Sequence, residues 1–157
     1  MVQVQILESA EGLSQRLGRA APARLALPFQ LLPPGTHEHC PDLLCIAPDG
    51  GGAPLPPACG TLLLPGSLSP LARQVKADCA VSYGVSPKDT LTFSWVEQGQ
   101  VGISLQRELV TLGQGTVERQ ELCFPFSGDQ PSLSLLAWVG LLLLLGVPPE
   151  DLATPEP

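Results

Sequence analysis

The chain has 157 residues, of which 44% are hydrophobic and only 15% are charged. This composition excludes a disordered acidic tail, although the net charge is −7. The eight Lys and Arg residues are spread along the chain and form no basic patch, which argues against nucleic acid as a partner. We expect one folded domain over residues 1–152 and a flexible C-terminal tail over residues 153–157.

The N-terminus and the cysteines bear on the cellular compartment. Residues 1–8 alternate apolar and polar side chains, and they lack the basic start and the long apolar stretch of a secretion signal. The five cysteines are odd in number and unevenly spaced, which indicates free thiols in a reducing compartment. Both observations predict a cytoplasmic protein.

The N-terminal half has the pattern of βα units with parallel strands. A helix is expected from an N-cap at Ser9 to about Ala20, and a shorter one is opened by Ser69 and Pro70. Short apolar runs bounded by turn residues are typical of strands buried on both faces of a parallel sheet. The strands are expected at residues 1–8, 24–27, 42–47, 61–64 and 78–83.

From Asp89 onward the pattern changes to alternation of apolar and polar residues, which is typical of strands with one drier face. Turn signals at 98–99 and 113–115 predict that residues 90–126 fold as an antiparallel meander. Residues 132–145 are apolar around the whole circumference of a helix, which predicts a helix buried in the core.

The last helix has a second interpretation as a membrane anchor. No charged residue lies between Asp129 and Glu150, and this length approaches what a bilayer requires. However, Pro131, Pro148 and Pro149 shorten the helical part, and no Lys or Arg flanks either end. We therefore favour a helix that is buried in the protein core over a helix that spans a membrane. The predicted fold class is α/β, a Rossmann-like parallel sheet with an added antiparallel meander and a buried C-terminal helix.

Two groups of residues offer weak indications of chemistry. His37, His39 and Cys40, with Cys45 nearby, are metal-ligand types, but structural zinc sites usually draw two ligand pairs from separated turns. The triple glycine at 50–52 lacks the Gly-Lys-Ser/Thr ending of a phosphate-binding loop and favours a flexible loop. We therefore expect no cofactor and assign no metal site, while metal binding by the His and Cys cluster stays an open alternative.

The segment 82–89 is the candidate ligand site because it follows a predicted parallel strand, and ligands of open α/β sheets collect at the carboxyl ends of their strands. Right-handed crossovers place the loop 50–52 on the same edge, as a flexible rim. Arg107 and Glu108 interrupt the alternation of the meander, where a bulge would re-aim them. The alternative is that the segment only closes a tight turn at Gly84. The candidate ligand-binding residues are Tyr83, Ser86, Lys88, Asp89 and Arg107.

Residues 59–152 resemble the closing part of the central domain of the Mur ligases, which are ATP-dependent enzymes that form amide bonds. The resemblance rests on the Tyr-Gly turn at 83–84, the meander, Gly128 and the Leu-Gly-Val-Pro-Pro sequence at 145–149. It implies the Mur ligase central-domain fold. The chain departs from the family in lacking its Gly-Lys-Thr/Ser ATP loop. Aligned on Gly128, the positions of the family's nucleotide-contacting His and two Asn residues are occupied by Gln130, Pro131 and Ser134.

These departures predict a stand-alone, Mur-ligase-like bacterial protein that catalyses nothing and binds a partner protein or a small molecule. Two alternatives stay open: a subunit of an ATP-dependent ligase that acts on cell-wall or related precursors, and a membrane-tethered protein held by residues 132–146. Without a phosphate cradle the chain is not expected to bind Mg-ATP. The expected shared core comprises the last helix with Leu43, Ile46, Leu62, Leu64 and Val81.

Overall fold

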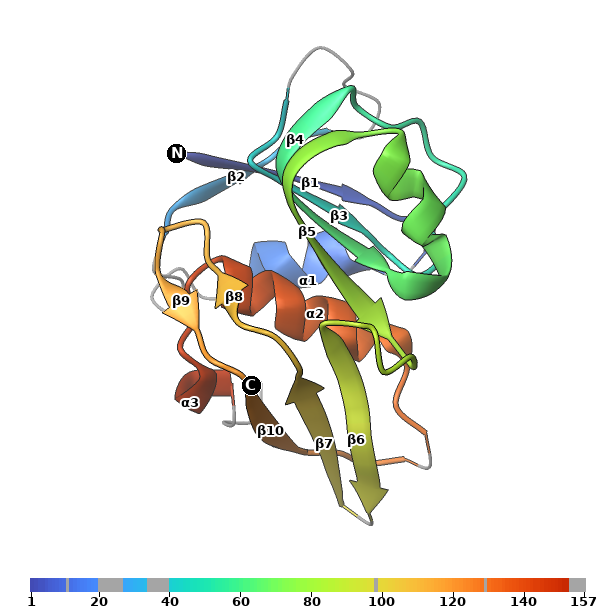
Figure 1. Ribbon diagram of the computed structural model, residues 1–157, viewed down its shortest axis with the longest axis vertical. Coiled ribbons are helices and arrows are strands. Elements are labelled where there is room, and N and C mark those ends of the chain that lie inside the picture. Colours follow the sequence, from blue (N-terminus) through green and yellow to red (C-terminus); the bar gives the residue numbers. More distant parts are fainter. Residues whose placement is uncertain (11, 20–26, 34–39, 98, 129, 153–157) are drawn as a thin grey trace.

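The computed structural model is an α/β structure with helices on both faces of a mostly parallel sheet (Figure 1). It describes residues 1–10, 12–19, 27–33, 40–97, 99–128 and 130–152. The elements in chain order are β1 (Val2–Leu7), α1 (Leu13–Arg19), β2 (Phe29–Leu31), β3 (Leu43–Ile46), β4 (Ala58–Pro65), the 3-10 helix η2 (Gly66–Arg73), β5 (Lys76–Gly84), β6 (Leu91–Glu97), β7 (Gln100–Leu105), β8 (Leu109–Val110), β9 (Thr116–Val117), β10 (Gln120–Pro125), α2 (Leu133–Leu144) and α3 (Pro149–Leu152).

Eight of these strands form one sheet in the order β10-β7-β6-β5-β4-β3-β1-β2, and β8 and β9 form a separate hairpin. Strands β1 to β6 run parallel to one another, whereas β7 is antiparallel to both β6 and β10. The parallel part therefore has the order 2-1-3-4-5-6, in which β1 to β5 follow one of the two common orders of doubly wound sheets. The meander joins it narrowly, since β5 pairs with β6 only through Tyr83 with Leu91 and Gly84 with Thr92.

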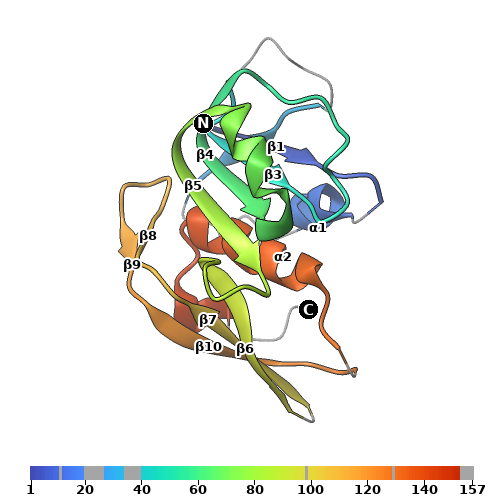
Figure 2. The ribbon, with the colours of Figure 1, turned by 45° about the vertical axis from the view of Figure 1, so that its right-hand side comes forward.

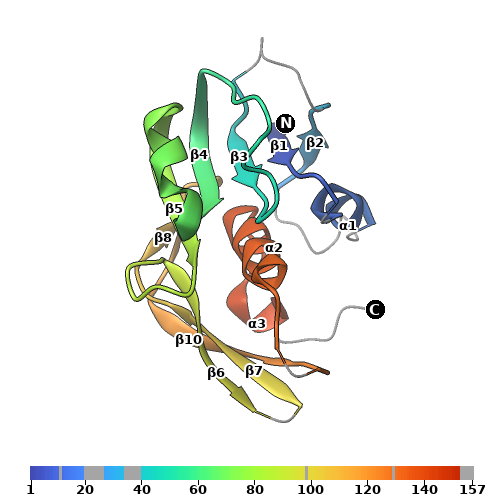
Figure 3. The same cartoon turned by 90° about the vertical axis from the view of Figure 1, so that its right-hand side faces the viewer.

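The sheet separates two hydrophobic cores. Figure 3 shows α1 and α2 on one side of the parallel strands and η2 on the other. Leu43 and Val81 pack in the core that contains α2, whereas the other predicted core residues, Ile46, Leu62 and Leu64, pack on the opposite face with side chains of η2. The expectation of one shared core was wrong because successive side chains of a strand point to opposite faces.

Helix α2 is the centre of the larger core, as its apolar sequence predicts. All residues from Leu136 to Leu145 are buried. Figure 2 shows the helix between the parallel strands and the meander, and it contacts β4, β5 and β6. At the C-terminal end of α2 the Leu144 carbonyl accepts a hydrogen bond from Leu112 N, which follows β8 (2.9 Å). On another side of the helix, the guanidinium of Arg16 in α1 lies 4.3 Å from the centre of the Trp138 ring. The helix thus bridges the two parts of the sheet.

The structure describes no helix that combines the length and the apolar character needed to cross a bilayer.

Both short helices begin elsewhere than predicted. Helix α1 begins at Leu13, because the Glu8 carboxylate, and not Ser9, accepts hydrogen bonds from the free amides of Leu13 (2.7 Å) and Ser14 (3.3 Å). The second helix is a 3-10 helix that begins at Gly66, so the predicted cap at residues 69–70 lies inside it. Its backbone leaves helical angles at Leu68, where two short turns are joined.

Two strand predictions also need correction. Strand β5 is buried only toward its carboxyl end, and Asp78 and Ala80 are exposed. The reason is that β6 pairs only with residues 83–84, so the first part of β5 is an edge. The strand expected at 24–27 lies almost entirely outside the described residues, and the observed β2 follows it at 29–31.

Candidate ligand-binding site

A cavity of about 600 Å³ lies at the carboxyl ends of β4 and β5. Its walls come from the start of η2, the loop after β5, the bend after β7 and the first residue of α2. Figure 1 shows the end of β5, η2 and the start of α2 toward the same end of the strands, although η2 and α2 lie on opposite faces of the sheet. Tyr83, Ser86, Lys88, Asp89 and Arg107, the residues singled out from the sequence, all line this cavity. Its volume lies within the usual range for small-molecule sites.

The loop after β5 is held by reciprocal hydrogen bonds between Ser86 and Asp89. Asp89 N donates to the Ser86 carbonyl (3.0 Å), and Ser86 N donates to Asp89 Oδ2 (3.1 Å). The Ser86 hydroxyl oxygen also accepts a hydrogen bond from Lys88 N (3.2 Å). Side chains of this kind imitate backbone turns, so the sequence Ser-Pro-Lys-Asp fixes its own conformation. The loop therefore presents Lys88 from a defined turn.

The Asp89 carboxylate is wedged between the ends of two strands. Asp89 is only 5% exposed. A Cβ atom added to Gly66 would lie 2.2 Å from Asp89 Oδ1, and one added to Gly84 would lie 2.5 Å from Asp89 Oδ2. Neither distance is compatible with a side chain. Glycine is therefore needed at both strand ends so that the carboxylate can occupy the floor of the cavity.

Gln106 brings the meander against this loop. Its side-chain amide donates to the carbonyls of Asp89 (2.6 Å) and Pro87 (3.1 Å), and its backbone N donates to the Thr90 carbonyl (2.8 Å). The next residue, Arg107, is placed at the cavity because β7 ends at Leu105. The predicted bulge does not occur there, and the register shift lies between Phe93 and Trp95 in β6.

Tyr83 lines the cavity but belongs mainly to the core. Its side chain is 0% exposed, and its hydroxyl donates a hydrogen bond of 2.6 Å to the Ile46 carbonyl. The phenol therefore joins the end of β5 to the end of β3 across β4. Its hydroxyl holds the floor of the site in place.

The walls of the cavity favour negative charge in a ligand. Lys88 and Arg107 are exposed cations at its edge. Both η2 and α2 begin at the cavity, and neither has an acidic residue in its first turn or a side-chain hydrogen bond at its N-cap. Amides at the start of a helix carry partial positive charge. The buried Asp89 carboxylate opposes these groups only in part, since it already accepts an amide hydrogen bond.

The usual ligand position of a sheet with this order is occupied by the chain itself. In such sheets ligands bind beyond the carboxyl ends of β1 and β3, where the strand order reverses. Here Asp49, which follows β3, accepts hydrogen bonds from Ser9 N (3.1 Å) and Ala10 N (2.8 Å), which follow β1. The amides that would receive an anionic ligand therefore hold a carboxylate of the protein.

The glycine loop does not form the predicted rim. Residues 50–52 lie at the same edge of the sheet but are not among the described lining residues of the cavity. Gly50 packs so closely on Leu7 that an added Cβ would lie 2.1 Å from its carbonyl oxygen. His37 and His39 lie outside the described residues. Within the part of the chain that the structure describes, no group of three or more His, Cys, Asp or Glu side chains could hold a metal ion.

Sequence reasoning missed several contributors to the cavity, among them residues of η2 and α2. Gly66 and Leu133 line it from elements that begin at its edge, and Ser67 adds a hydroxyl. Gln106 sets the position of Arg107 through its two side-chain hydrogen bonds. No local pattern distinguishes these residues, because they meet the loop only through tertiary contacts. Pro65 and Gly66 are turn residues that bound the strand expected at 61–64, but the role of Gly66 beside Asp89 depends on a residue far along the chain.

The sequence matches no protein-family model and no curated protein. The resemblance to the Mur ligases therefore stays a prediction based on the residues that carry it.

Proposed function

We propose that this protein is a non-catalytic binding protein of the bacterial cytoplasm, and that its ligand is a small molecule with a carboxylate or phosphate group. The observation that carries the proposal is the convergence of Lys88 and Arg107 from separate segments on one cavity where two helices begin. Charge-assisted hydrogen bonds from these cations would orient the anionic group of the ligand. The Mur-ligase-like ancestry remains part of this proposal.

A small molecule fits the site better than a protein partner. The polar groups face a hollow of about 600 Å³, and Asp89, Tyr83 and Gly84 at its floor are buried. A protein surface would reach only the exposed edge. Binding without chemistry also agrees with the sequence, which lacks the phosphate loop of the ATP-dependent ligases.

The test is a chemical-shift titration of the full chain with inorganic phosphate, benzoate and Mg-ATP. We expect saturable shifts for phosphate or benzoate at residues 66–69 and 84–89. Lys88→Ala and Arg107→Ala should each weaken that binding at least fivefold without lowering the melting temperature, because both side chains are exposed. Mg-ATP should bind no more tightly than phosphate alone.

Two control variants separate binding from folding. Arg73→Ala removes an exposed cation at the other end of η2 and should leave anion binding unchanged. Tyr83→Phe should cost about 1–2 kcal/mol of stability, because it leaves the Ile46 carbonyl without its buried donor, and it therefore shows what a loss of folding stability looks like beside the Lys88 and Arg107 variants. Undiminished binding in both the Lys88 and Arg107 variants, or no saturable anion binding, would contradict the proposal.

A further inference from the structure

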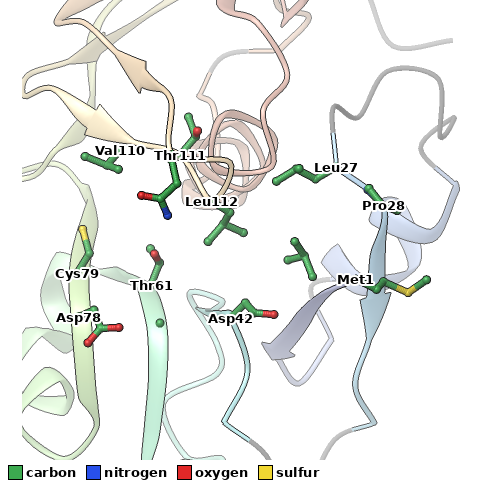
Figure 4. A pocket seen from close by; sticks show the side chains of 13 residues that line it. Met1, Leu27, Pro28, Asp42, Thr61, Asp78, Cys79, Val110, Thr111 and Leu112 are labelled. Atoms are coloured by element: carbon green, nitrogen blue, oxygen red, sulfur yellow. The ribbon is translucent and has the colours of Figure 1, made fainter.

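A second cavity, of about 530 Å³, lies at the opposite ends of the same strands. Figure 4 shows it between the amino ends of β3, β4 and β5 and the β8–β9 hairpin, with Leu27, Pro28 and Met1 on the far side. Backbone bonds define its floor: Thr61 N donates to the Asp42 carbonyl (2.8 Å) and Gly60 N to the Pro41 carbonyl (3.0 Å). The hairpin above it is tied to α2 through Leu112 N.

Thr61 is the unusual residue of this cavity. It is 8% exposed, and its hydroxyl has no hydrogen-bond partner among the described residues. Figure 4 shows the hydroxyl pointing across the cavity toward the hairpin. The side chain is mostly buried but its oxygen is accessible from the cavity, since Gln5 Oε1 is the one fully buried side-chain oxygen or nitrogen that lacks a partner among the described residues. A hydroxyl in this position forms its hydrogen bond with what occupies the cavity, a water molecule or a ligand. Thr61 therefore offers a hydrogen bond to an occupant of this cavity.

The charge of the cavity indicates what that group is. Asp42 and Asp78 are its charged side chains, and no Lys, Arg or His side chain is among its described lining residues. Asp42 Oδ2 already accepts a hydrogen bond from Gln3 N (2.8 Å), but no hydrogen bond to the Asp78 carboxylate is found within the described part of the chain. The apolar part of the remaining wall comes from Leu27 on one side and from Val110 and Leu112 of the hairpin on the other, and the hairpin also contributes the uncharged polar residues Thr111 and Gln114. A group that donates hydrogen bonds and carries positive charge suits this lining.

We propose that this cavity binds a small primary amine with an apolar body, whose ammonium group donates a hydrogen bond to Thr61 Oγ1 and pairs with Asp78. The apolar body lies against Leu112 and Leu27 beneath the hairpin. This site is independent of the anion site at the carboxyl ends of the strands. It gives the protein two separate binding functions.

The experiment titrates the full chain with 2-phenylethylamine and with two probes of similar shape, the neutral 2-phenylethanol and the anionic 3-phenylpropionate. We expect saturable chemical-shift changes for the amine, centred on the amides of Thr61, Cys79 and residues 110–114. The alcohol should bind at least fivefold more weakly, and the carboxylate should produce no saturable change there.

Variants assign the two polar contacts. Thr61→Val keeps the shape of the side chain and removes the hydroxyl, and it should weaken amine binding about three- to tenfold. Asp78→Asn removes an exposed charge and should weaken it by a similar factor without loss of folding. Glu97→Gln is the matched control, since it removes one exposed carboxylate at the far end of the meander and should leave amine binding unchanged.

Cys79 provides a second measurement because it lines the cavity and is half-buried. With Cys40 and Cys123 replaced by Ser, the amine should slow the reaction of Cys79 with a maleimide, and 3-phenylpropionate should not. Equal binding of amine and carboxylate, wild-type affinity in both Thr61→Val and Asp78→Asn, or absence of saturable amine binding would each overturn the proposal. None of these outcomes bears on anion binding by Lys88 and Arg107.

Discussion

At the carboxyl ends of β4 and β5 a cavity is bordered by Lys88 and Arg107, whereas at the amino ends of the same strands a cavity is bordered by Asp42 and Asp78. A strand of eight residues such as β4 separates its ends by about 25 Å. This distance is several times the Debye length of about 8 Å at physiological ionic strength. The two ends are therefore electrostatically independent, and the net charge of −7 does not describe either of them.

The largest effect should come from changes that fill the floor of either cavity. Gly66→Ala places a Cβ against Asp89 Oδ1 and should cost about 3 kcal/mol of unfolding free energy. Gly60→Ala at the other end should also be costly, because its Cβ would lie 2.7 Å from the Asp42 carbonyl oxygen. Gly52→Ala, with no atom within 4 Å, is the neutral control in urea denaturation.

The two ends differ in how this damage can be repaired. In an Asp89→Ala background, Gly66→Ala should cost less than about 1 kcal/mol, since the clashing carboxylate is gone. No side-chain change can relieve Gly60→Ala, because its contact is with backbone. An undiminished cost of Gly66→Ala in the Asp89→Ala protein would show that Asp89 does not fill the space beside Gly66.

A smaller effect is expected from the residue that joins the meander to the carboxyl end. Gln106→Ala removes the hydrogen bonds to the Asp89 and Pro87 carbonyls and should lower the unfolding free energy by about 1–2 kcal/mol. It should also weaken anion binding, because Arg107 loses its support. Gln120→Ala, which removes only an exposed bond to Glu118 two residues away, should change stability by less than about 0.5 kcal/mol. If Gln106→Ala and Gln120→Ala changed stability and anion binding equally, Gln106 would not have a positioning role.

The smallest expected effect is on the pH dependence of stability, through Cys59 near the amino end of β4. Burial, followed by the charges of Asp78 and Cys40, raises the pKa of Cys59 to about 11. The unfolded thiol ionises first, at about pH 8.5. The stabilisation is therefore complete below that pH and is lost as the pH rises toward 11. Burial and the Glu8 charge raise the pKa of Cys45 as well, which adds to the loss.

Asp78→Asn should reduce this alkaline loss by less than about 0.5 kcal/mol, because it removes only the smaller, exposed cause of the Cys59 shift. Urea midpoints measured between pH 8 and pH 11 would detect the change. Glu97→Gln should leave the pH profile as in the wild type. A steeper alkaline loss in the Asp78 variant would mean that Asp78 does not act on Cys59.

The sequence predicted what depends on local patterning. Alternation and apolar runs identified the α/β class, the meander and the buried α2, and Ser82 to Asp89 was found because it follows an apolar strand. The missing parts depend on long-range partners. Nothing near Gly66 indicates a carboxylate from position 89, and nothing near Thr61 indicates a hairpin at 109–117 above it. The division into two cores likewise required knowing which side of the sheet each helix covers.

Helix α2 is synthesised after every strand that it covers. Until it emerges from the ribosome, one face of β4, β5 and β6 has no helix to shield Leu63, Val81 and Leu91 from water. Nascent chains with exposed apolar strands are prone to aggregation and are bound by chaperones. The order of elements along the chain thus makes closure of the larger core depend on a segment that is translated after the sheet, and a ribosome stalled before residue 133 would hold a sheet whose larger core is open.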